Sequence, residues 1–218
     1  TGGSDTEAYE GCLVTVENVT VDNADLNNGE WSVTDGTNSV RVDDIWDFYY
    51  FPETGQALAG VAGVMTYTYS DAKLEPRLAR DVVEADGAPV RLQRIQQVLY
   101  SDLMKAGEDE ESDKSYMVDE TVTIEGIVTM PSGLSYAGAG VKFIFADVHG
   151  GPWSAILSYD PDSAAFPTLF EGDLIQATGY IAEYSTGPAN MTELFITEPI
   201  NIIDFEQPLP VIDTVNTG

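Results

Sequence analysis

The chain contains an internal repeat, and no other feature of its sequence constrains the fold as strongly. Segments rich in β-branched residues fill the first half, and segments of the same kind follow in the same order in the second half. The matched segments are residues 10–21 with 120–130, 31–44 with 143–159, 54–69 with 171–184, and 73–83 with 192–203. The second of these pairs is long enough for two strands in each half, and the other pairs hold one strand each. We therefore expect two copies of a five-stranded β unit.

The strand assignments depend on alternation and on turn residues. Val14 and Val16, like Val122 and Ile124, are two residues apart with a polar residue between them, which is typical of a strand with one buried face. Two sites tolerate the positive φ of tight hairpins, Asp35-Gly36 and His149-Gly150-Gly151. Three glycines interrupt strands where a bulge or barrel corner would bend the sheet: Gly60, Gly63 and Gly179.

This pattern predicts an all-β fold, with two tandem five-stranded OB-like Greek-key barrels joined by a short helical connector. In each copy the longer connection between the third and fourth strands, 45–53 and 160–170, fits that fold. A single seven-stranded sandwich is the alternative, because separate strands do not reveal closure. The expected divisions are a first barrel over 1–87, a connector over 88–115, a second barrel over 116–207, and a terminal strand or strap over 208–218.

The connector is expected to hold one helix. Pro89 suits a first helical position, and four apolar residues would line one face up to Gly107: Ile95, Val98, Leu99 and Leu103. The acidic run 108–113 should be exposed. We expect the helix to dock between the barrels.

The net charge of −28 is spread over both halves: 17 acidic and 4 basic residues precede Gly87, and 20 and 5 follow it. A field of this sign repels nucleic acid and anionic lipid, and it suits calcium, cationic partners or a saline habitat. The simplest explanation of the charge is a solvated acidic surface that binds no partner. No apolar stretch is long enough for a membrane span. Cys12 is the only cysteine and is expected to be buried as a small apolar residue.

Several short motifs resemble the OB-fold modules attached to secreted bacterial nucleases and related extracellular proteins. They are Tyr9-Glu10-Gly11, residues 14–20, Trp31 to Gly36, Pro76-Arg77, Gly150 to Ser154, Gly172-Asp173, Thr192 to Leu194, and Leu209-Pro210. The resemblance implies an extracellular location. In such nucleases the barrels flank a separate metal-dependent domain, which needs clustered histidine and acidic residues. His149 is the only histidine here, so the resemblance implies a chain without that enzyme domain.

The residues themselves also indicate no catalytic centre. No nucleophile elbow, phosphate-binding loop or zinc-protease motif occurs in the sequence. Calcium is a possible cofactor, because Asp22, Asp25, Asn27 and Glu30 place hard oxygens on a turn, and Asp43 and Asp44 form a second cluster. Turns rich in Asp and Asn are also common without metal.

Four aromatic residues are candidates for stacking on a ligand: Trp31, Tyr67, Tyr69 and Trp153. Such residues could bind single-stranded DNA, as OB-folds do, or a polysaccharide. The charge argues against nucleic acid, whereas stacking on sugars needs no net charge.

Two apolar segments are candidates for contacts with copies of the chain. One is a loop containing Trp46, Phe48, Tyr49, Tyr50 and Phe51, which could instead close the barrel core. The other is the tail with Leu209, Pro210, Val211, Ile212 and Val215, which could dock head to tail on the next copy or lie on its own second barrel.

The function that these features predict is a non-catalytic extracellular structural or adhesive module that self-assembles, with a filament as one outcome. The alternative is a ligand-binding accessory module of a secreted hydrolase, with single-stranded DNA or polysaccharide as the ligand.

Overall fold

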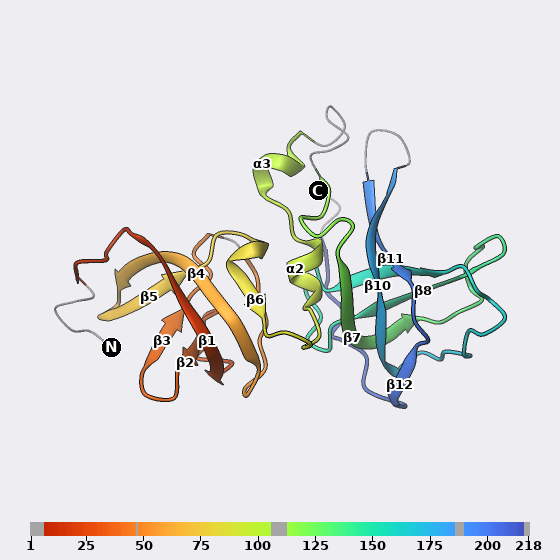
Figure 1. The fold of residues 1–218 in the computed structure, drawn as a ribbon, viewed down its shortest axis with the longest axis horizontal. Coiled ribbons are helices and arrows are strands. Elements are labelled where there is room, and N and C mark those ends of the chain that lie inside the picture. The colour runs from red at the N-terminus through yellow and green to blue at the C-terminus, as the bar shows by residue number, and fades with distance from the viewer. Residues whose placement is uncertain (1–6, 47, 106–112, 186–189, 216–218) are drawn as a thin grey trace. The chain divides into compact units, whose positions relative to one another are not determined.

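The computed structural model describes residues 7–46, 48–105, 113–185 and 190–215. Residue 47 of the predicted connection 45–53, most of the acidic run 108–113 and the last three residues of the predicted tail 208–218 lie outside these ranges. The fold is all-β, as the sequence predicts, and it divides into two compact units, Thr1–Ala88 and Pro89–Gly218 (Figure 1). A single sandwich is excluded, because each unit has a sheet and a hydrophobic core of its own.

The first unit is built from six strands, β1 (Leu13–Asn23), β2 (Trp31–Thr34), β3 (Ser39–Val42), β4 (Ala57–Thr68), β5 (Asp71–Glu75) and β6 (Val82–Glu84), with a 3-10 helix, η1 (Ala79–Asp81), before β6. Five strands form a ring in the order β1-β2-β3-β5-β4, which β4 closes by pairing with β1. β3 and β5 are parallel and the other neighbours are antiparallel. This is the OB topology.

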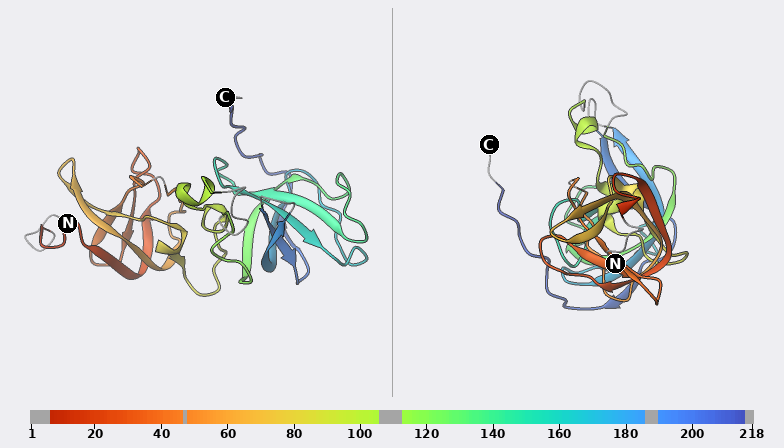
Figure 2. Two further views of the ribbon diagram at one scale, coloured as in Figure 1. Left: turned by 90° about the horizontal axis from the view of Figure 1, so that it is seen from above. Right: turned by 90° about the vertical axis from the view of Figure 1, so that its left-hand side faces the viewer.

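The second unit repeats this topology with β7 (Thr121–Met130), β8 (Val141–Ala146), β9 (Ala155–Asp160), β10 (Leu174–Ser185), β11 (Asn190–Ile196) and β12 (Asn201–Asp204). Its ring runs β7-β8-β9-β11-β10, with β9 and β11 parallel. The strands of each unit coil around the core of that unit (Figures 1 and 2). The duplication inferred from sequence is therefore confirmed at the level of strand order.

Within the described ranges each copy has six strands, one more than the sequence pattern indicated. The segment 73–83, interpreted above as a single strand, is divided into β5 and β6, and 192–203 is divided into β11 and β12. Pro76 and Pro199 lie in the two breaks, where proline has no N–H to donate to a ladder. β6 and β12 then pair with β4 and β10, beside the ring.

Long fourth strands allow this arrangement. β4 pairs with β6 near its start and with β5 near its end, and β10 pairs in the same way with β12 and then β11. Gly63 and Gly179 lie where the change of partner occurs. A Cβ at Gly63 would lie 2.6 Å from the Glu75 backbone, and one at Gly179 would lie 2.2 Å from the Phe195 carbonyl oxygen. The glycines predicted at barrel corners are thus sites of close backbone approach.

The connector differs from the expected single helix. It forms two short helices, α2 (Leu92–Gln96) and α3 (Tyr100–Leu103), which the extended residues Gln97 and Leu99 separate. Leu92 and Ile95 are fully buried in the core of the second barrel. α2 is therefore an integral part of the second unit. None of the helices that the structure describes is long and apolar enough to span a membrane.

Candidate ligand-binding faces

The register of the parallel strand pairs shows which outward residues correspond between the two barrels. Val42 pairs with Leu74 in the first barrel, and Ser158 pairs with Leu194 in the second; all four side chains are buried. The residues on either side of Leu74 and Leu194 alternate to the outer face. Lys73 therefore corresponds to Glu193, and Glu75 corresponds to Phe195.

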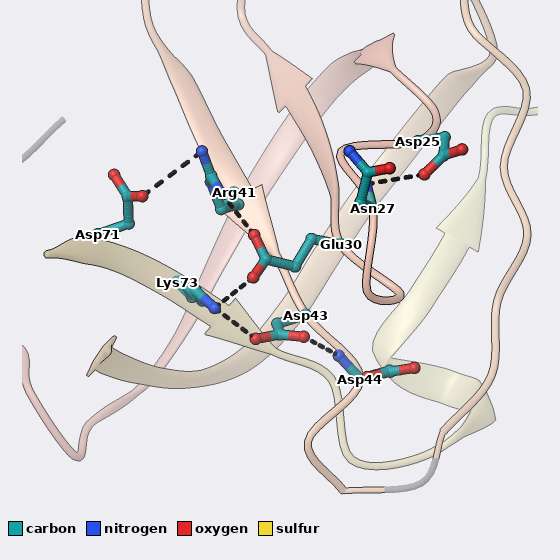
Figure 3. A network of polar contacts seen from close by, with 8 residues as sticks. All are labelled: Asp25, Asn27, Glu30, Arg41, Asp43, Asp44, Asp71 and Lys73. Atoms are coloured by element: carbon teal, nitrogen blue, oxygen red, sulfur yellow. Dashed lines mark hydrogen bonds and ion pairs between the residues drawn. The ribbon is translucent and has the colours of Figure 1, made fainter. Parts of the chain in front are cut away.

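In the first barrel this face carries a network of ion pairs (Figure 3). The Lys73 ammonium is 2.5 Å from Glu30 Oε1 and 2.8 Å from Asp43 Oδ2, and only 2% of the Lys73 side chain is exposed. Arg41 donates to the second Glu30 oxygen at 2.6 Å and approaches Asp71 at 3.5 Å. Burial by itself lowers the pKa of Lys73, but the hydrogen bonds to Asp43 and Glu30 outweigh it and raise that pKa above its usual value.

Glu75 lies at the edge of the same network. Its side chain is fully buried, and Thr66 donates to its Oε1 at 2.6 Å. Its Oε2 makes no hydrogen bond with any described residue. Burial raises the pKa of Glu75. The charges on this face are directed at one another, which leaves little for a ligand to bind.

The corresponding face of the second barrel is aromatic. The register places Lys142, Tyr159, Phe195 and Tyr180 side by side on β8, β9, β11 and β10. The Tyr180 and Phe195 rings are stacked with centroids 4.8 Å apart, and the Tyr159 ring meets the Phe195 edge at 5.5 Å. We call these three residues the aromatic row. All three are half-buried, so each presents part of a ring to solvent.

One cation and one carboxylate flank the aromatic row. Lys142 Nζ is 3.9 Å from Glu193 Oε1 and 5.5 Å from the centroid of Tyr184, a side chain that is 53% exposed. Glu193 Oε1 has no hydrogen-bond partner among the described residues. Burial raises the pKa of Glu193, and the nearby Lys142 ammonium opposes that shift.

A groove of about 400 Å³ continues this face toward the start of β9. Its apolar lining includes Ile144 and Leu157 from the sheet, Met191 from β11, and Val98 from the connector. Trp153 lines it as well and has a φ of 63°, a strained conformation for a bulky residue. Aromatic and apolar groups therefore extend along β9 from Trp153 to Tyr159.

The residues proposed as calcium ligands are placed as follows. Asp22 accepts hydrogen bonds from Ser32 and Ser39, and Asp25 accepts one from the Asn27 backbone N–H. Glu30 and Asp43 are paired with Lys73, as described above. The Asp44 carboxylate lies against Gly29, close enough that a Cβ there would be 2.3 Å from Asp44 Oδ2. Within the described ranges, no three His, Cys, Asp or Glu side chains gather as metal ligands.

The four aromatic residues proposed for stacking are divided between core and surface. Trp31 is only 3% exposed and packs 5.7 Å from Tyr50 in the first core, so its proposed stacking role is wrong. Tyr67 and Tyr69 are exposed at the β4–β5 hairpin, where Tyr69 and Ser70 have positive φ. Trp153 is the only one of the four that lines the groove on the second barrel.

The apolar loop mainly closes the first core. Phe48 and Tyr50 are buried there, while Trp46 is 50% exposed and Tyr49 and Phe51 are intermediate. The proposed contact role is therefore wrong for Phe48 and Tyr50, since buried side chains cannot meet a neighbour. Cys12, which was expected to be buried, is exposed.

The tail contacts the second barrel through its backbone. The Gln207 N–H donates to Gly172 O at 2.8 Å, and a Cβ at Gly150 would lie 3.1 Å from Pro210 Cβ. Beyond Pro210 the chain runs out from the barrel, and Val211, Ile212 and Val215 are about 80–90% exposed (Figure 2).

No member of the aromatic row was named as a site residue from the sequence. The available signal was alternation, because Ile156, Ser158 and Leu194 point inward and Tyr159 and Phe195 must then point outward. Their adjacency depends on the parallel pairing of β9 with β11, which alternation alone does not reveal.

Comparison with known proteins gives structural matches at low similarity. No protein family model and no curated protein sequence matches the chain. Among solved structures, the tetrameric p202 HIN2 aligns at 11% identity and a TM-score of 0.32, over 88% of this chain and 92% of its own. The Ifi202 HINa domain in complex with 20-base-pair double-stranded DNA aligns at 10% and 0.26, over 84% and 92%. A multidomain protein with nucleic acid binding domains from Streptococcus pneumoniae aligns at 10% and 0.23, over 88% and 75%.

These comparisons correct two expectations from sequence. The similar structures include proteins described as bound to double-stranded DNA, which overturns the expectation that nucleic acid is an unlikely partner. None is described as an extracellular structural or adhesive module, and that functional prediction is not upheld. The head-to-tail docking of the tail on a further copy stays a prediction. No match links the chain to modules of secreted nucleases; the OB-like architecture is what remains of that resemblance.

Proposed function

We propose that the chain is a ligand-binding module whose second barrel binds single-stranded nucleic acid by stacking bases on its outer face. The observation that carries the proposal is the aromatic row, three rings in contact across β9, β11 and β10. OB-folds bind ligands on this kind of surface, and each base stacked on an aromatic ring contributes roughly 1–3 kcal/mol.

The geometry assigns a role to each flanking group. Tyr159, Phe195 and Tyr180 supply ring faces and edges, and Tyr184 extends the surface toward the end of β10. Lys142 is the cation nearest the row, and a backbone phosphate that approached it would compete with Glu193. Binding would then depend on stacking far more than on charge.

The first barrel has a different part in this proposal. At the corresponding position its face carries Lys73, Glu30 and Asp43 in mutual ion pairs, where the second barrel carries rings. We assign that face to stability and expect it to bind no bases. The two copies of one fold have diverged into a charged face and an aromatic face.

The test is calorimetric titration of the full chain with a thymidine dodecamer. Phe195→Leu and Tyr180→Leu keep apolar volume but remove the rings, and each should weaken binding by about fivefold or more if one base stacks there. Tyr69→Leu is the matched control, since Tyr69 is 94% exposed and belongs to the first barrel. Equal affinities for all the proteins would refute the assignment of the site.

A neutral oligosaccharide is the second candidate ligand. It is favoured by the pairing of Lys142 with Glu193 and by the net charge of −28, because a sugar ring can stack on Tyr180 or Phe195 without a cation. Titration with an uncharged glucan hexamer separates the two candidates. Loss of glucan binding in Phe195→Leu, with no response to the dodecamer, would favour the second.

The setting of the module is also a proposal. We infer that it lacks a catalytic centre, acts outside the cell, and holds a polymer for a secreted hydrolase of the nuclease type. The composition supports the lack of a catalytic centre, since His149 is the sole histidine and the sequence contains no catalytic motif. Measurable cleavage of the dodecamer by the purified chain would argue against it.

A further inference from the structure

Residues 90–96 of the connector fill an opening of the second barrel, and we call this segment the plug. Val90 donates its backbone N–H to Thr123 O on β7, and α2 then inserts Leu92 and Ile95 into the core. Gln96 Nε2 donates to Ala155 O at the start of β9. The connector thus closes the opening between β7 and the β8–β9 turn.

An ion pair anchors this plug. Arg91 lies 3.3 Å from Asp147 Oδ2, and the Asp147 side chain is 1% exposed. Asp147 is the first residue after β8, and its Oδ1 accepts the N–H of His149 two residues on. One carboxylate oxygen therefore shapes the turn while the other holds the arginine.

The first barrel has the same acceptor. Asp35 is the first residue after β2, and its Oδ1 accepts the N–H of Thr37 two residues on, at 2.7 Å. The register supports the equivalence, because β1 meets the end of β2 through Thr20–Thr34 as β7 meets the end of β8 through Ile127–Ala146. Unlike Asp147, Asp35 is exposed, and no cation pairs with it among the described residues.

Beside Asp35 the first barrel has an open pocket of about 330 Å³. Its floor is apolar and its rim is acidic or polar. The lining residues are Val16, Val19, Val33, Val40, Met65 and Ala72, with Glu17, Asp35, Asn38 and Ser39 at the rim.

The course of β1 explains the pocket. β1 pairs with β4 through residues 13–20 but with β2 only through 20–23, so the other edge of its first half meets no described strand. Asn18, at a φ of 53°, shifts the alternation, so that Val16 and Val19 both line the opening. In the second barrel the segment containing Val90 lies along the corresponding edge of β7.

We propose that this pocket is a docking site for a short peptide segment of a partner protein, chemically like the connector's own plug. The segment would carry two branched aliphatic side chains three residues apart, as Leu92 and Ile95 are, and an arginine just before the first. The aliphatic groups cover Val16, Val19 and Val40, and the arginine pairs with Asp35 and Glu17. The ionised state of Asp35 is secured by the backbone N–H groups of Asn38 and Thr37, which lower its pKa.

The probe is a synthetic peptide with the sequence of residues 89–98, added to the isotope-labelled full chain and followed by NMR. We expect saturable shifts of the Val16, Val33 and Val40 amides. Asp35→Asn keeps the turn acceptor and removes the charge, and it should weaken binding by about fivefold, as expected for a partly exposed charge pair. Ser39→Trp, at an exposed rim position, should abolish binding by filling the mouth.

Two controls make the outcome decisive. Asp25→Asn alters a similar exposed turn in the same barrel, away from the pocket, and should leave the affinity unchanged. The peptide with Arg91→Glu should not bind. Equal binding of that peptide, an unchanged affinity in Asp35→Asn, or shifts confined to the second barrel would each overturn the proposal. The aromatic row is on the other barrel, so these results do not depend on its function.

Discussion

At the scale of single residues, the charged groups of the first barrel are organised around a lysine. Lys73 is 43 positions from Glu30 and 30 from Asp43, yet its ammonium contacts both carboxylates. The sequence shows the acidic residues as a cluster, and such a cluster suggests calcium. It does not show that a strand far along the chain brings a cation to two of them, Glu30 and Asp43.

Replacement of that lysine should be costly. Lys73→Met leaves Glu30 and Asp43 with 12% and 15% exposed side chains and no ammonium, so we expect the free energy of unfolding to fall by about 3–5 kcal/mol. Urea denaturation at pH 7 measures this loss. Lys105→Met is the matched control, because its pair with Asp102 is on the surface and should be worth less than about 1 kcal/mol. Similar losses in both variants would contradict the central role of Lys73.

The contribution of Glu193 to the stability of the fold should depend on pH in a definite direction. Its raised pKa means that the folded state binds this proton more tightly than the unfolded state does. Glu193 therefore costs no stability below the pKa that it has in the unfolded protein. It lowers the free energy of unfolding as the pH rises from there through its higher pKa in the folded protein. Glu193→Gln should raise the urea midpoint relative to wild type at pH 7, and the difference should shrink toward pH 4. A difference that grows on acidification would show that folding does not raise the pKa of Glu193.

At the scale of elements, the duplicated ring could be predicted because alternation, turns and glycines repeat in both halves. The sixth strands were missed because proline breaks within a β-rich segment do not show where the chain pairs next. The connector was predicted as one helix because Ile95, Val98, Leu99 and Leu103 share a helical spacing. Leu92 and Ile95 pack into the core of the second barrel, and helical spacing does not reveal such tertiary contacts.

The glycines in β4 test where this strand changes its pairing partner from β6 to β5. Gly63→Ala places a methyl group 2.6 Å from the Glu75 backbone, and we expect a loss of about 1–3 kcal/mol in the free energy of unfolding, the usual cost of overpacking. Gly60 is a control on the same strand, since a Cβ there would lie 3.2 Å from Val16 O, a milder contact. Thermal denaturation should show a clearly smaller effect for Gly60→Ala. A larger loss for Gly60→Ala than for Gly63→Ala would contradict the assignment of the change of partner to Gly63.

At the scale of the whole molecule, charge decides how the proposed site behaves in salt. A chain of net charge −28 repels a polyanion, and the Debye length falls from about 30 Å at 0.01 M to about 8 Å at 0.15 M. Binding of the thymidine dodecamer should therefore tighten as salt rises through this range. Proteins with basic grooves show the opposite trend, because they release counterions from the phosphates. A steep loss of affinity with salt would indicate a cationic surface that the described residues do not form.

The central claim is that the aromatic row of the second barrel is where a ligand's rings stack. The most direct measurement is NMR of the full chain, with observation of the side-chain protons of Tyr159, Tyr180 and Phe195 during titration with the thymidine dodecamer at 0.15 M salt. Stacking of bases on these rings should give saturable upfield ring-current shifts of these protons, and none at Tyr69. Shifts confined to the first barrel, or rings that respond neither to the dodecamer nor to the glucan hexamer, would contradict it.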